Sequence, residues 1–299
     1  MILTVTANPC IDVTVFANKE HTQEAGGKGV NVARVLQNLG AEALALTYGD
    51  APFATLMQTD GIPCALVPRE VRVITTHVAT DGMQTVDMQR GLPLTQEEAD
   101  ALYDMFLLHM PQAEMVVVSG ALPGPLARMT TPADAIYTRI SAYCVQHDLP
   151  VWLDMHGPGT MEALAQQPAF WKPNEHEWTA VTGQPASPEA VQAWLQAQQL
   201  NTTVLLSLGE QGAACITCGE IIRQASFAVP TVNAVGSGDC FTAAYVYRLL
   251  QGDCAAACLR YACAAGAANA AVFAAATVGV GDVERVLGTI NSKTKKQNI

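Results

Sequence analysis

The sequence predicts an α/β protein with three layers, in which a mostly parallel sheet is covered by helices on both faces. Three observations support this prediction. The chain has 299 residues and half of them are hydrophobic, which is enough for a large buried core. Short runs rich in β-branched residues alternate with stretches of helical periodicity. These runs are apolar almost throughout, as is typical of strands that are buried on both faces.

The expected elements follow one another regularly along the chain. Strands are predicted at residues 2–7, 42–47, 114–120, 150–155 and 202–208, and the helices between them include 30–39, 95–109 and 188–199. In the helix at 30–39, Val32, Leu36 and Leu39 share one face, and Gly40 provides the stop. The tract at 263–281 is dominated by Ala and Gly. Its hydrophobicity is too weak for a membrane span, so a buried helix is predicted there.

Two segments break this rhythm by alternating polar and apolar residues. They lie at roughly 12–24 and 70–92, and the second contains a turn at Asp81–Gly82. Such alternation predicts exposed antiparallel strands, which would form a small β lid over the carboxyl ends of the parallel strands. No linker or repeat marks a boundary, so residues 1–299 are expected to form a single domain.

Composition narrows the function classes. The formal charge of −11 argues against binding to nucleic acid, because no basic stripe is present to neutralise phosphates. The opening residues have no positive region and only a short apolar run, so no signal peptide is expected. Nine cysteines, an odd number, indicate reduced thiols and a cytoplasmic protein. Cys215 and Cys218 form a lone CxxC in a predicted strand and turn, which is a poor context for a metal or redox site.

A glycine-rich segment near the start resembles a phosphate-binding loop only superficially. Gly26, Gly27, Lys28 and Gly29 run directly into the predicted helix at 30–39. A Walker A loop would need Gly at position 22 and Ser or Thr at position 29, and neither is present. A Rossmann loop is excluded as well, because position 32 is Val.

A second glycine-rich segment is the better phosphate site. Gly236, Ser237 and Gly238 immediately precede a predicted helix that ends at Gly252. The first amides of a helix are unpaired and carry the positive end of its dipole, and glycine lets an anion approach closely. Asp239 follows in the first turn. From the residues alone, it is either a capping carboxylate or a base for a hydroxyl that attacks a phosphoryl group.

Five segments together resemble a known family. They are GGKGVN at 26–31, KPNEHE at 172–177, SLGEQGA at 207–213, GSGDCFTA at 236–243 and AGAANA at 265–270. In this order they are similar to the signatures of the ribokinase-like carbohydrate kinases, the phosphofructokinase B group. Residues 2–14 and 229–239 look most like kinases of the 1-phosphofructokinase and tagatose-6-phosphate kinase type. The resemblance implies a ribokinase-like fold and ATP-dependent phosphorylation of a sugar hydroxyl, most specifically on a ketohexose phosphate.

The resemblance also implies roles for residues on the nucleotide side. Asp239 would take the proton of the attacking hydroxyl, while the amides of Gly236, Ser237 and Gly238 would stabilise the transferring phosphoryl group. Asn174 and Glu177 match the N-x-x-E pair that organises Mg²⁺, and the expected contact is through water, since Mg²⁺ dehydrates reluctantly. From the residues alone, Asn174 could equally be a helix cap. The residues implied to bind the nucleotide are Lys172, Ser207, Gly209, Gly212 and Asn269.

The sugar half is implied by the first signature and by the lid. Asp12, Gly26, Gly27, Lys28 and Asn31 match sugar ligands, and Arg72 and Arg90 of the lid are candidate ligands of a substrate phosphate. Here the chain departs from the pattern of hexose-phosphate members, because the lid runs lack the expected Lys and Asn. This departure leaves open a sugar phosphate, an unphosphorylated sugar or a nucleoside as substrate. A sugar-binding protein without catalysis is the alternative from another class. An exposed lid edge also favours a homodimer joined through the lids.

Overall fold

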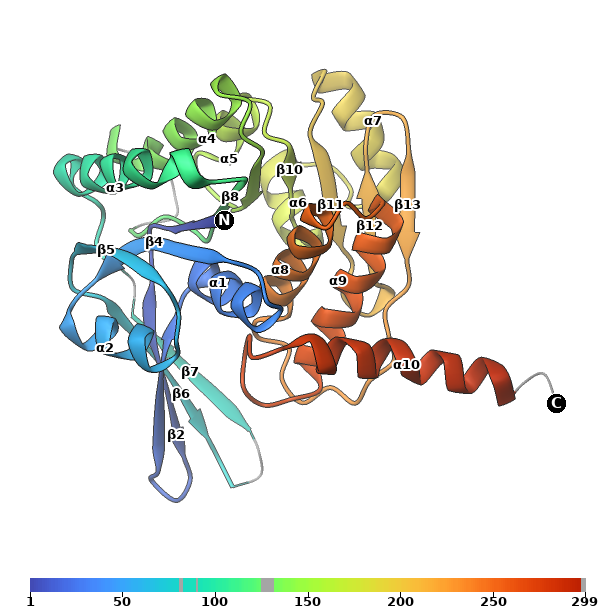
Figure 1. Cartoon of the computed structure of the whole chain (residues 1–299), viewed down its shortest axis with the longest axis horizontal. Helices are drawn as coiled ribbons and strands as arrows, with labels where there is room; N and C mark the ends of the chain where they lie inside the picture. Colours follow the sequence, from blue (N-terminus) through green and yellow to red (C-terminus); the bar gives the residue numbers. More distant parts are fainter. Residues whose placement is uncertain (81–82, 90, 125–131, 297–299) are drawn as a thin grey trace.

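The computed structural model describes residues 1–80, 83–89, 91–124 and 132–296, and it contains two sheets within this part of the chain. The larger sheet has nine strands in the order β13-β12-β11-β10-β9-β8-β1-β4-β5 (Figure 1). In chain order these are β1 (Ile2–Thr6), β4 (Ala43–Gly49), β5 (Cys64–Pro68), β8 (Met115–Ser119), β9 (Val151–Asp154), β10 (Phe170–Trp171), β11 (Thr203–Ser207), β12 (Ala213–Ile216) and β13 (Ile221–Gln224). The strands from β5 to β11 are parallel, and β12 and β13 are antiparallel additions at one edge.

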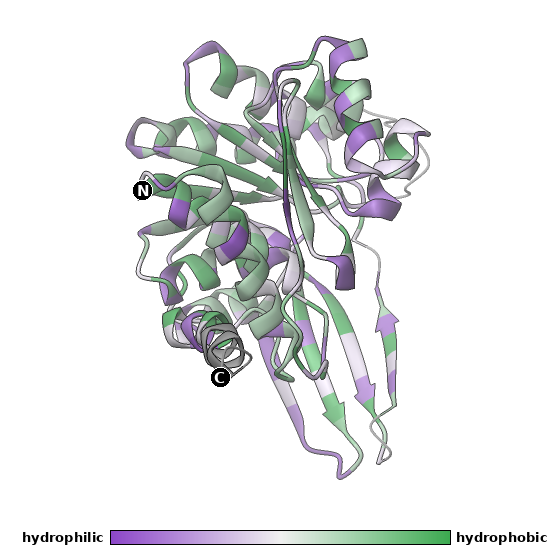
Figure 2. Ribbon diagram, turned by 90° about the vertical axis from the view of Figure 1, so that its right-hand side faces the viewer, coloured by the Kyte–Doolittle hydropathy of each residue, from purple (hydrophilic) through white to green (hydrophobic). Residues whose placement is uncertain are grey.

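Helices cover both faces of this sheet, as the sequence predicts. One face carries α1 (Lys28–Asn38), α2 (Ala51–Thr59), α8 (Ser237–Leu250), α9 (Ala255–Ala270) and α10 (Val280–Lys296). The other carries α3 (Gln96–His109), α4 (Ile136–Gln146), α5 (Thr160–Leu164), α6 (Glu175–Thr182) and α7 (Pro188–Gln198). Successive residues of a strand point to opposite faces, so Met115 packs into one core and Val116 into the other. Both faces must therefore be apolar, and the central strands are correspondingly hydrophobic in Figure 2.

The smaller sheet is the lid, formed by β2 (Cys10–Phe16), β3 (His21–Gly26), β6 (Arg72–Val78) and β7 (Gln84–Met88). Its order is β3-β2-β6-β7, and the strands project from the body of the protein (Figure 1). The two outer pairs are antiparallel, but β2 and β6 run parallel, which corrects the prediction of a wholly antiparallel lid. Alternation of polar and apolar residues marks a half-buried strand and carries no information on its direction. The predicted turn at Asp81–Gly82 lies outside the described residues.

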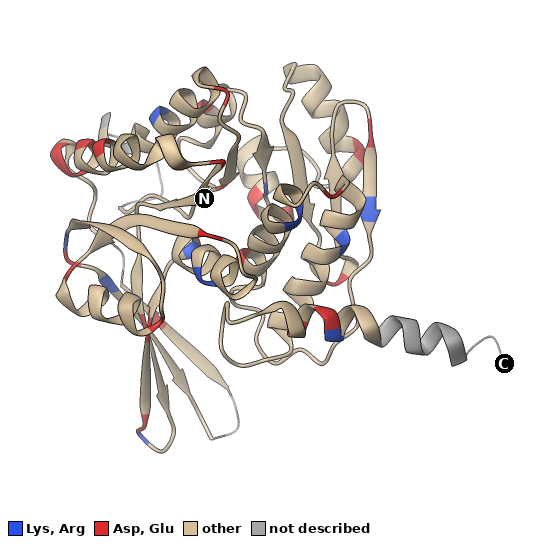
Figure 3. Ribbon diagram, viewed as in Figure 1, with Lys and Arg blue, Asp and Glu red and all other residues tan. Residues whose placement is uncertain are grey.

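One predicted helix is shorter than expected. The Ala- and Gly-rich tract at 263–281 is helical only as far as Ala270, after which the chain forms a loop before α10 begins at Val280. Val272 and Phe273 in this loop are 42% and 39% exposed. Across the described residues, no helix is long and apolar enough to cross a membrane. Figure 3 shows Lys and Arg spread over separate elements of the described chain, with acidic residues among them.

Candidate active site

The candidate site lies where the strand order reverses. From β1 the chain continues outward through β4 and β5, and it then returns to the other side of β1 through β8 and β9. Open α/β sheets bind ligands at such a switch point, beyond the carboxyl ends of the strands. Ser119, Asp154 and Ser207 are the last residues of β8, β9 and β11, and Lys172 follows β10 directly.

Helix α8 begins at this edge through a left-handed glycine. Gly236 is the N-cap of α8 with a φ of +81°, and a Cβ on it would lie 3.0 Å from the amide nitrogen of Ala276. Only glycine takes this conformation at low cost, so the residue type is required. The Ser237 amide donates to the carbonyl of Ala234 at 3.2 Å. Of the three amides predicted to bind phosphate, that of Ser237 is therefore already used within the protein.

Asn269 holds this glycine-rich loop in place. Its side chain is fully buried, and its Nδ2 donates to the carbonyl of Val235 at 2.8 Å and to Ser237 Oγ at 3.1 Å. Its Oδ1 accepts the amide of Ala276 at 2.7 Å and the thiol of Cys240 at 3.4 Å. The amide group is thus fully engaged within the protein, and the predicted place of Asn269 on the nucleotide side stays a prediction. Asn269 braces the start of α8.

Asp239 lies in the first turn of α8, is 6% exposed, and faces α1. Asn31 Nδ2 donates to Asp239 Oδ2 at 2.8 Å, which joins a predicted sugar ligand to the predicted base. Burial and the nearby Asp154 raise the pKa of Asp239 to about 6, although Lys28, Asn31 and Lys172 oppose the shift. A carboxylate with this pKa is ionised at neutral pH and is still basic enough to accept a proton from a reacting hydroxyl.

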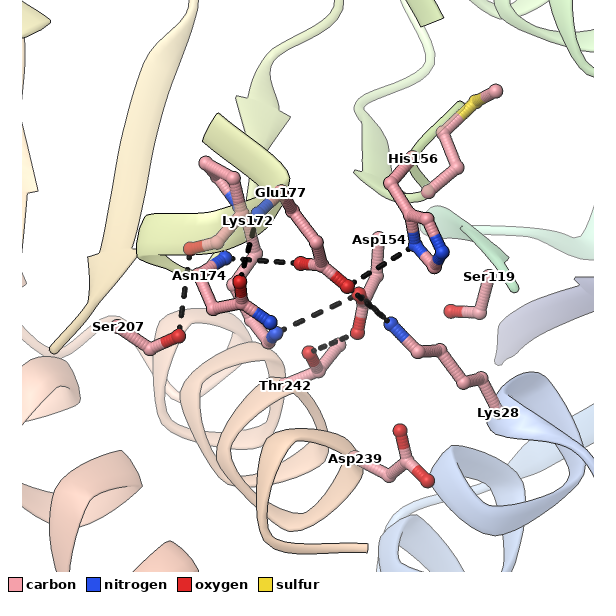
Figure 4. A network of polar contacts seen from close by, with 12 residues as sticks. Lys28, Ser119, Asp154, His156, Lys172, Asn174, Glu177, Ser207, Asp239 and Thr242 are labelled. Atoms are coloured by element: carbon pink, nitrogen blue, oxygen red, sulfur yellow. Dashed lines mark hydrogen bonds and ion pairs between the residues drawn. The ribbon is translucent and has the colours of Figure 1, made fainter. Parts of the chain in front are cut away.

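Asp154, which the sequence prediction missed, is the centre of the buried network in Figure 4. It is completely buried, and its Oδ1 lies 3.0 Å from Lys28 Nζ and 3.5 Å from Lys172 Nζ. Its Oδ2 accepts the Thr242 hydroxyl at 3.1 Å. Burial opposes ionisation, but the two lysines hold the pKa of Asp154 below its usual value. The signal in the sequence was a charged residue at the end of an apolar strand.

This network also changes the interpretation of the two lysines. Lys28 was expected to help bind the sugar or its phosphate, but its ammonium group faces Asp154 and Glu177, at 3.0 and 3.4 Å (Figure 4). Lys172 is 3% exposed, and a Cβ on Gly238 would lie 3.4 Å from its Nζ. Its charge thus lies directly behind Gly238 in the first turn of α8.

Asn174 and Glu177 form a capping box at the start of α6. Asn174 Oδ1 accepts the Glu177 amide, and Glu177 Oε2 accepts the Asn174 amide, both at 2.9 Å. The two residues therefore cap α6, and they also lie beside the network around Asp154 (Figure 4). Glu177 Oε1 lies 3.4 Å from Lys28 Nζ and 3.1 Å from His156 Nδ1. Burial opposes ionisation, but His156, Lys28 and Lys172 hold the pKa of Glu177 below its usual value.

The donor set fits a magnesium ion held through water. Every carboxylate oxygen of Asp154 and Glu177 already has a protein partner, as the distances above show. Among the described residues, no group of three or more His, Cys, Asp and Glu side chains forms a ready-made metal cage. Mg²⁺ keeps much of its hydration shell and takes its direct ligands from substrate phosphates, which suits such a site.

The remaining nucleotide-side residues lie at turns beside β11. Ser207 Oγ donates to the carbonyl of Pro173 at 3.4 Å, and the backbones of Ser207 and Asn174 form a parallel bridge. Gly209 and Gly212 have φ values of +54° and +99°. A Cβ on Gly212 would lie 2.0 Å from the carbonyl oxygen of Gln224, so this position excludes any side chain.

The sugar half is formed by the base of the lid. Asp12 in β2 is paired with Glu24 in β3, and a Cβ on the nearby Gly26 would lie 1.9 Å from Asp12 Oδ2. Gly26 therefore makes room for the carboxylate. Gly27 has a φ of +109° and directs the chain into α1. Burial raises the pKa of Asp12, while the thiol of Cys10, whose Sγ is 3.4 Å from Asp12 Oδ1, and Arg72 lower it.

Arg72 is cross-strand neighbour to Cys10 and lines a cavity of about 360 Å³. Its Nη1 donates to the carbonyl of Gln89 at 3.2 Å, but its buried Nε has no partner in the described part of the chain. Arg69 lines the same cavity and is held by Glu98 at 2.9 Å and by the carbonyl of Leu92 at 2.7 Å. Arg90, the other predicted ligand from the lid, lies outside the described residues.

The lid also contacts the nucleotide side, which the sequence did not predict. The rings of Phe16 at the end of β2 and Phe273 in the loop after α9 are 5.7 Å apart and tilted by 39°. The Phe273 carbonyl accepts Asn233 Nδ2 at 2.8 Å. Phe273 therefore connects the lid, through Phe16, with Asn233 in the loop that precedes α8.

Comparison with known proteins decides the family. Residues 2–278 match the model of the pfkB family of carbohydrate kinases. The chain belongs to that family. It is therefore an ATP-dependent carbohydrate kinase, and the fold and activity class predicted from the five segments are confirmed. The roles of the individual residues remain predictions.

Individual relatives of this pfkB kinase are moderately similar. A 1-phosphofructokinase of Haloferax volcanii is 29% identical over 263 residues, which cover 80% of this chain and 81% of that protein. An ATP-dependent 6-phosphofructokinase isozyme 2 of Mycobacterium tuberculosis is 27% identical over 305 residues, which cover 95% of this chain and 88% of that protein. The crystal structure of phosphofructokinase-2 from Escherichia coli in complex with potassium has a TM-score of 0.84 at 23% identity. The match covers 97% of this chain and 99% of that chain. This last similarity concerns the fold.

Proposed function

We propose that this kinase transfers the terminal phosphoryl group of magnesium-bound ATP to a hydroxyl of a ketohexose phosphate. Asp239 accepts the proton of the attacking hydroxyl, and the amides of Gly236 and Gly238 face the phosphoryl group as its charge develops. Asp12 and Asn31 hold the sugar through its hydroxyls. Lys172, behind Gly238, adds positive charge close to the phosphates.

Magnesium would enter with the nucleotide and neutralise charge on its phosphates. Glu177 and Asn174 would orient its water shell, with Glu177 kept ionised by the cations around it. This assignment rests on the donor set described above and on the family to which the chain belongs.

One observation favours a phosphorylated sugar. Arg72 brings a guanidinium group to the cavity of about 360 Å³, and among the described residues its buried Nε lacks a partner. A buried donor without an acceptor costs about 1–3 kcal/mol, and a phosphate oxygen would remove that cost. The names of the two curated relatives, a 1-phosphofructokinase and a 6-phosphofructokinase, agree with such a substrate.

The test is an ADP-release screen over phosphorylated and unphosphorylated ketoses, with ATP and magnesium. A ketohexose phosphate should give the highest kcat/KM, and Arg72→Ala should lower it through KM. Arg139→Ala is the matched control, because Arg139 pairs with Asp100 on the helix layer far from the lid. Equal rates with unphosphorylated sugars, or no response to Arg72→Ala, would contradict the proposed substrate class.

Two further parts of the proposal concern the state of the protein. We expect a homodimer in which lids pair, since every residue of the edge strand β7 is exposed and Val86 and Met88 are apolar. A relative of the same fold, phosphofructokinase-2 from Escherichia coli, has a tetrameric inhibited form. Light scattering on the chain and on Val86→Lys distinguishes these states. The nine free cysteines suit a reducing, cytoplasmic location.

A further inference from the structure

Arg34 in α1 is a buried cation that no part of the proposed chemistry uses. It is 8% exposed and bonds to three acceptors from three different elements. Its Nη1 donates to Asn31 Oδ1 at 2.9 Å, and its Nη2 donates to Asp60 Oδ2 at 2.9 Å and to the carbonyl of Ala25. These acceptors lie in α1, at the end of α2 and in lid strand β3, so the guanidinium group is held from three sides.

The contact with Asn31 fixes which way its amide points. A guanidinium group only donates hydrogen bonds, so the oxygen of Asn31 must face Arg34. The NH2 group of Asn31 must then face the other way, where Asp239 Oδ2 accepts it at 2.8 Å. If the amide were turned over, its NH2 group would oppose the guanidinium and its oxygen would oppose the carboxylate. Both contacts would be repulsive, so the hydrogen-bonding chemistry of the two neighbours determines the orientation of the amide.

We propose that Arg34 is a positioning residue for the general base, acting on Asp239 through the amide of Asn31. This inference deepens the proposed function and rests on it, because it assumes that Asp239 takes the proton of the sugar. With one carboxylate oxygen held by Asn31, the other oxygen, Oδ1, is presented to the acceptor hydroxyl in a fixed direction. Proton transfer is sensitive to this direction, since the base must lie within hydrogen-bond reach of the hydroxyl.

The experiment is a double-mutant cycle on kcat with Arg34→Lys and Asn31→Ala. Lysine keeps the positive charge but cannot satisfy three acceptors in separate directions. We expect Arg34→Lys to lower kcat about 10-fold with KM values for ATP and sugar changed less than about threefold, and Asn31→Ala to lower kcat about 100-fold. If Arg34 acts through Asn31, the double variant should be no slower than Asn31→Ala alone. A double variant slower by the product of the two effects would overturn the proposal.

Two controls separate positioning from a loss of folding. Asp60→Asn removes the charge on the far side of Arg34 and should lower the melting temperature while leaving kcat within about twofold. Arg248→Lys changes an arginine at the other end of α8, paired with Asp253, and should leave kcat unchanged. If Arg34→Lys lowers kcat no more than these controls do, the proposal fails.

Asp239→Asn distinguishes the failure of this inference from the failure of the proposed function. If Asp239→Asn retains turnover, the base assignment itself is wrong. If Asp239→Asn is inactive and the Arg34 and Asn31 effects multiply, only the positioning role of Arg34 is lost.

Discussion

The two halves of the site differ in how completely their polar groups are bonded. On the nucleotide side, Asp154 and Asn269 are fully buried, and all of their side-chain oxygens have protein partners. On the proposed sugar side, the Nε of Arg72 lies beside a cavity of about 360 Å³ and is buried without a partner among the residues that the structure describes. Apart from the buried Cys10 and Ile11, the residues of the lid strands β2, β6 and β7 are half-buried or exposed.

This difference separates two tasks. The nucleotide side is preorganised: its charges are fixed by one another before any ligand arrives, as electrostatic stabilisation of a transition state requires. The proposed sugar side keeps a donor, the Nε of Arg72, for the substrate, so we expect its residues to determine which sugar binds. Changes on the first side should therefore reduce turnover or stability, and changes on the second should change substrate affinity.

The largest expected effect is the loss of turnover in Asp239→Asn. Without a base, kcat should fall about 1,000-fold or more, while calorimetry should find ATP binding nearly unchanged. The folded state binds the proton of Asp239 more tightly than the unfolded state does, because its pKa is raised to about 6. The ionised group therefore destabilises the fold above that pH, so the variant should melt at a higher temperature at pH 7. Undiminished turnover would remove Asp239 from the base role.

Asp154→Asn should show how strongly the nucleotide side depends on its own charges. The change leaves Lys28 and Lys172 without their shared counter-ion in a buried site. Loss of one partner of a buried ion pair costs about 3–5 kcal/mol, which urea unfolding would measure. Glu114→Gln, at an exposed ion pair with the amino terminus, is the control and should cost less than about 1 kcal/mol. Equal costs for the two variants would contradict the preorganised network.

Only part of this contrast could be predicted from the sequence. A helix was predicted after the glycine-rich segment because its parts, Gly236 to Asp239, are consecutive and local chemistry is sufficient to interpret them, although α8 begins two residues earlier than predicted, at Ser237. Asp154 was missed because its partners come from α1, β10 and α8, which only the folded chain brings together. The ion pair of Lys28 was missed for the same reason. Its neighbours in the sequence suggested a sugar contact, whereas its ammonium group pairs with Asp154 at the end of β9. The parallel pairing of β2 and β6 also depends on topology, which alternation does not encode.

On the sugar side, Arg72→Ala should raise KM for the sugar phosphate about 10- to 100-fold and change kcat less than about threefold. The guanidinium group supplies charge-assisted bonds that are present in both the bound and the transition state, so mainly affinity is lost. Initial-rate kinetics with saturating ATP measure both constants. A fall in kcat at unchanged KM would show that Arg72 belongs with the nucleotide side.

The pH dependence joins the two halves through Asn31. The base works only when it is ionised, so kcat/KM should fall about tenfold per pH unit below about pH 6. A substrate phosphate titrates in the same range, and Asn31→Ala separates the two origins. Asn31 donates to the charged form of Asp239, so its loss should move the acidic limb to higher pH. A limb that stays in place would assign the titration to the substrate.

The smallest expected effect concerns the contact between the lid and the nucleotide side. Phe273→Ala removes the ring that meets Phe16 and should raise KM for both substrates about two- to fivefold. Phe273→Tyr retains the ring and serves as the control. If only the KM of ATP changes, the contact does not link the two halves.

The most direct measurement is a crystal structure with a non-hydrolysable ATP analogue, magnesium and the preferred sugar phosphate. The terminal phosphate should lie at the start of α8, within hydrogen-bond reach of the Gly238 amide. Asp239 Oδ1 should lie about 3 Å from the acceptor hydroxyl, with Oδ2 still held by Asn31. A triphosphate bound elsewhere, or an Asp239 carboxylate out of reach of every sugar oxygen, would contradict the account.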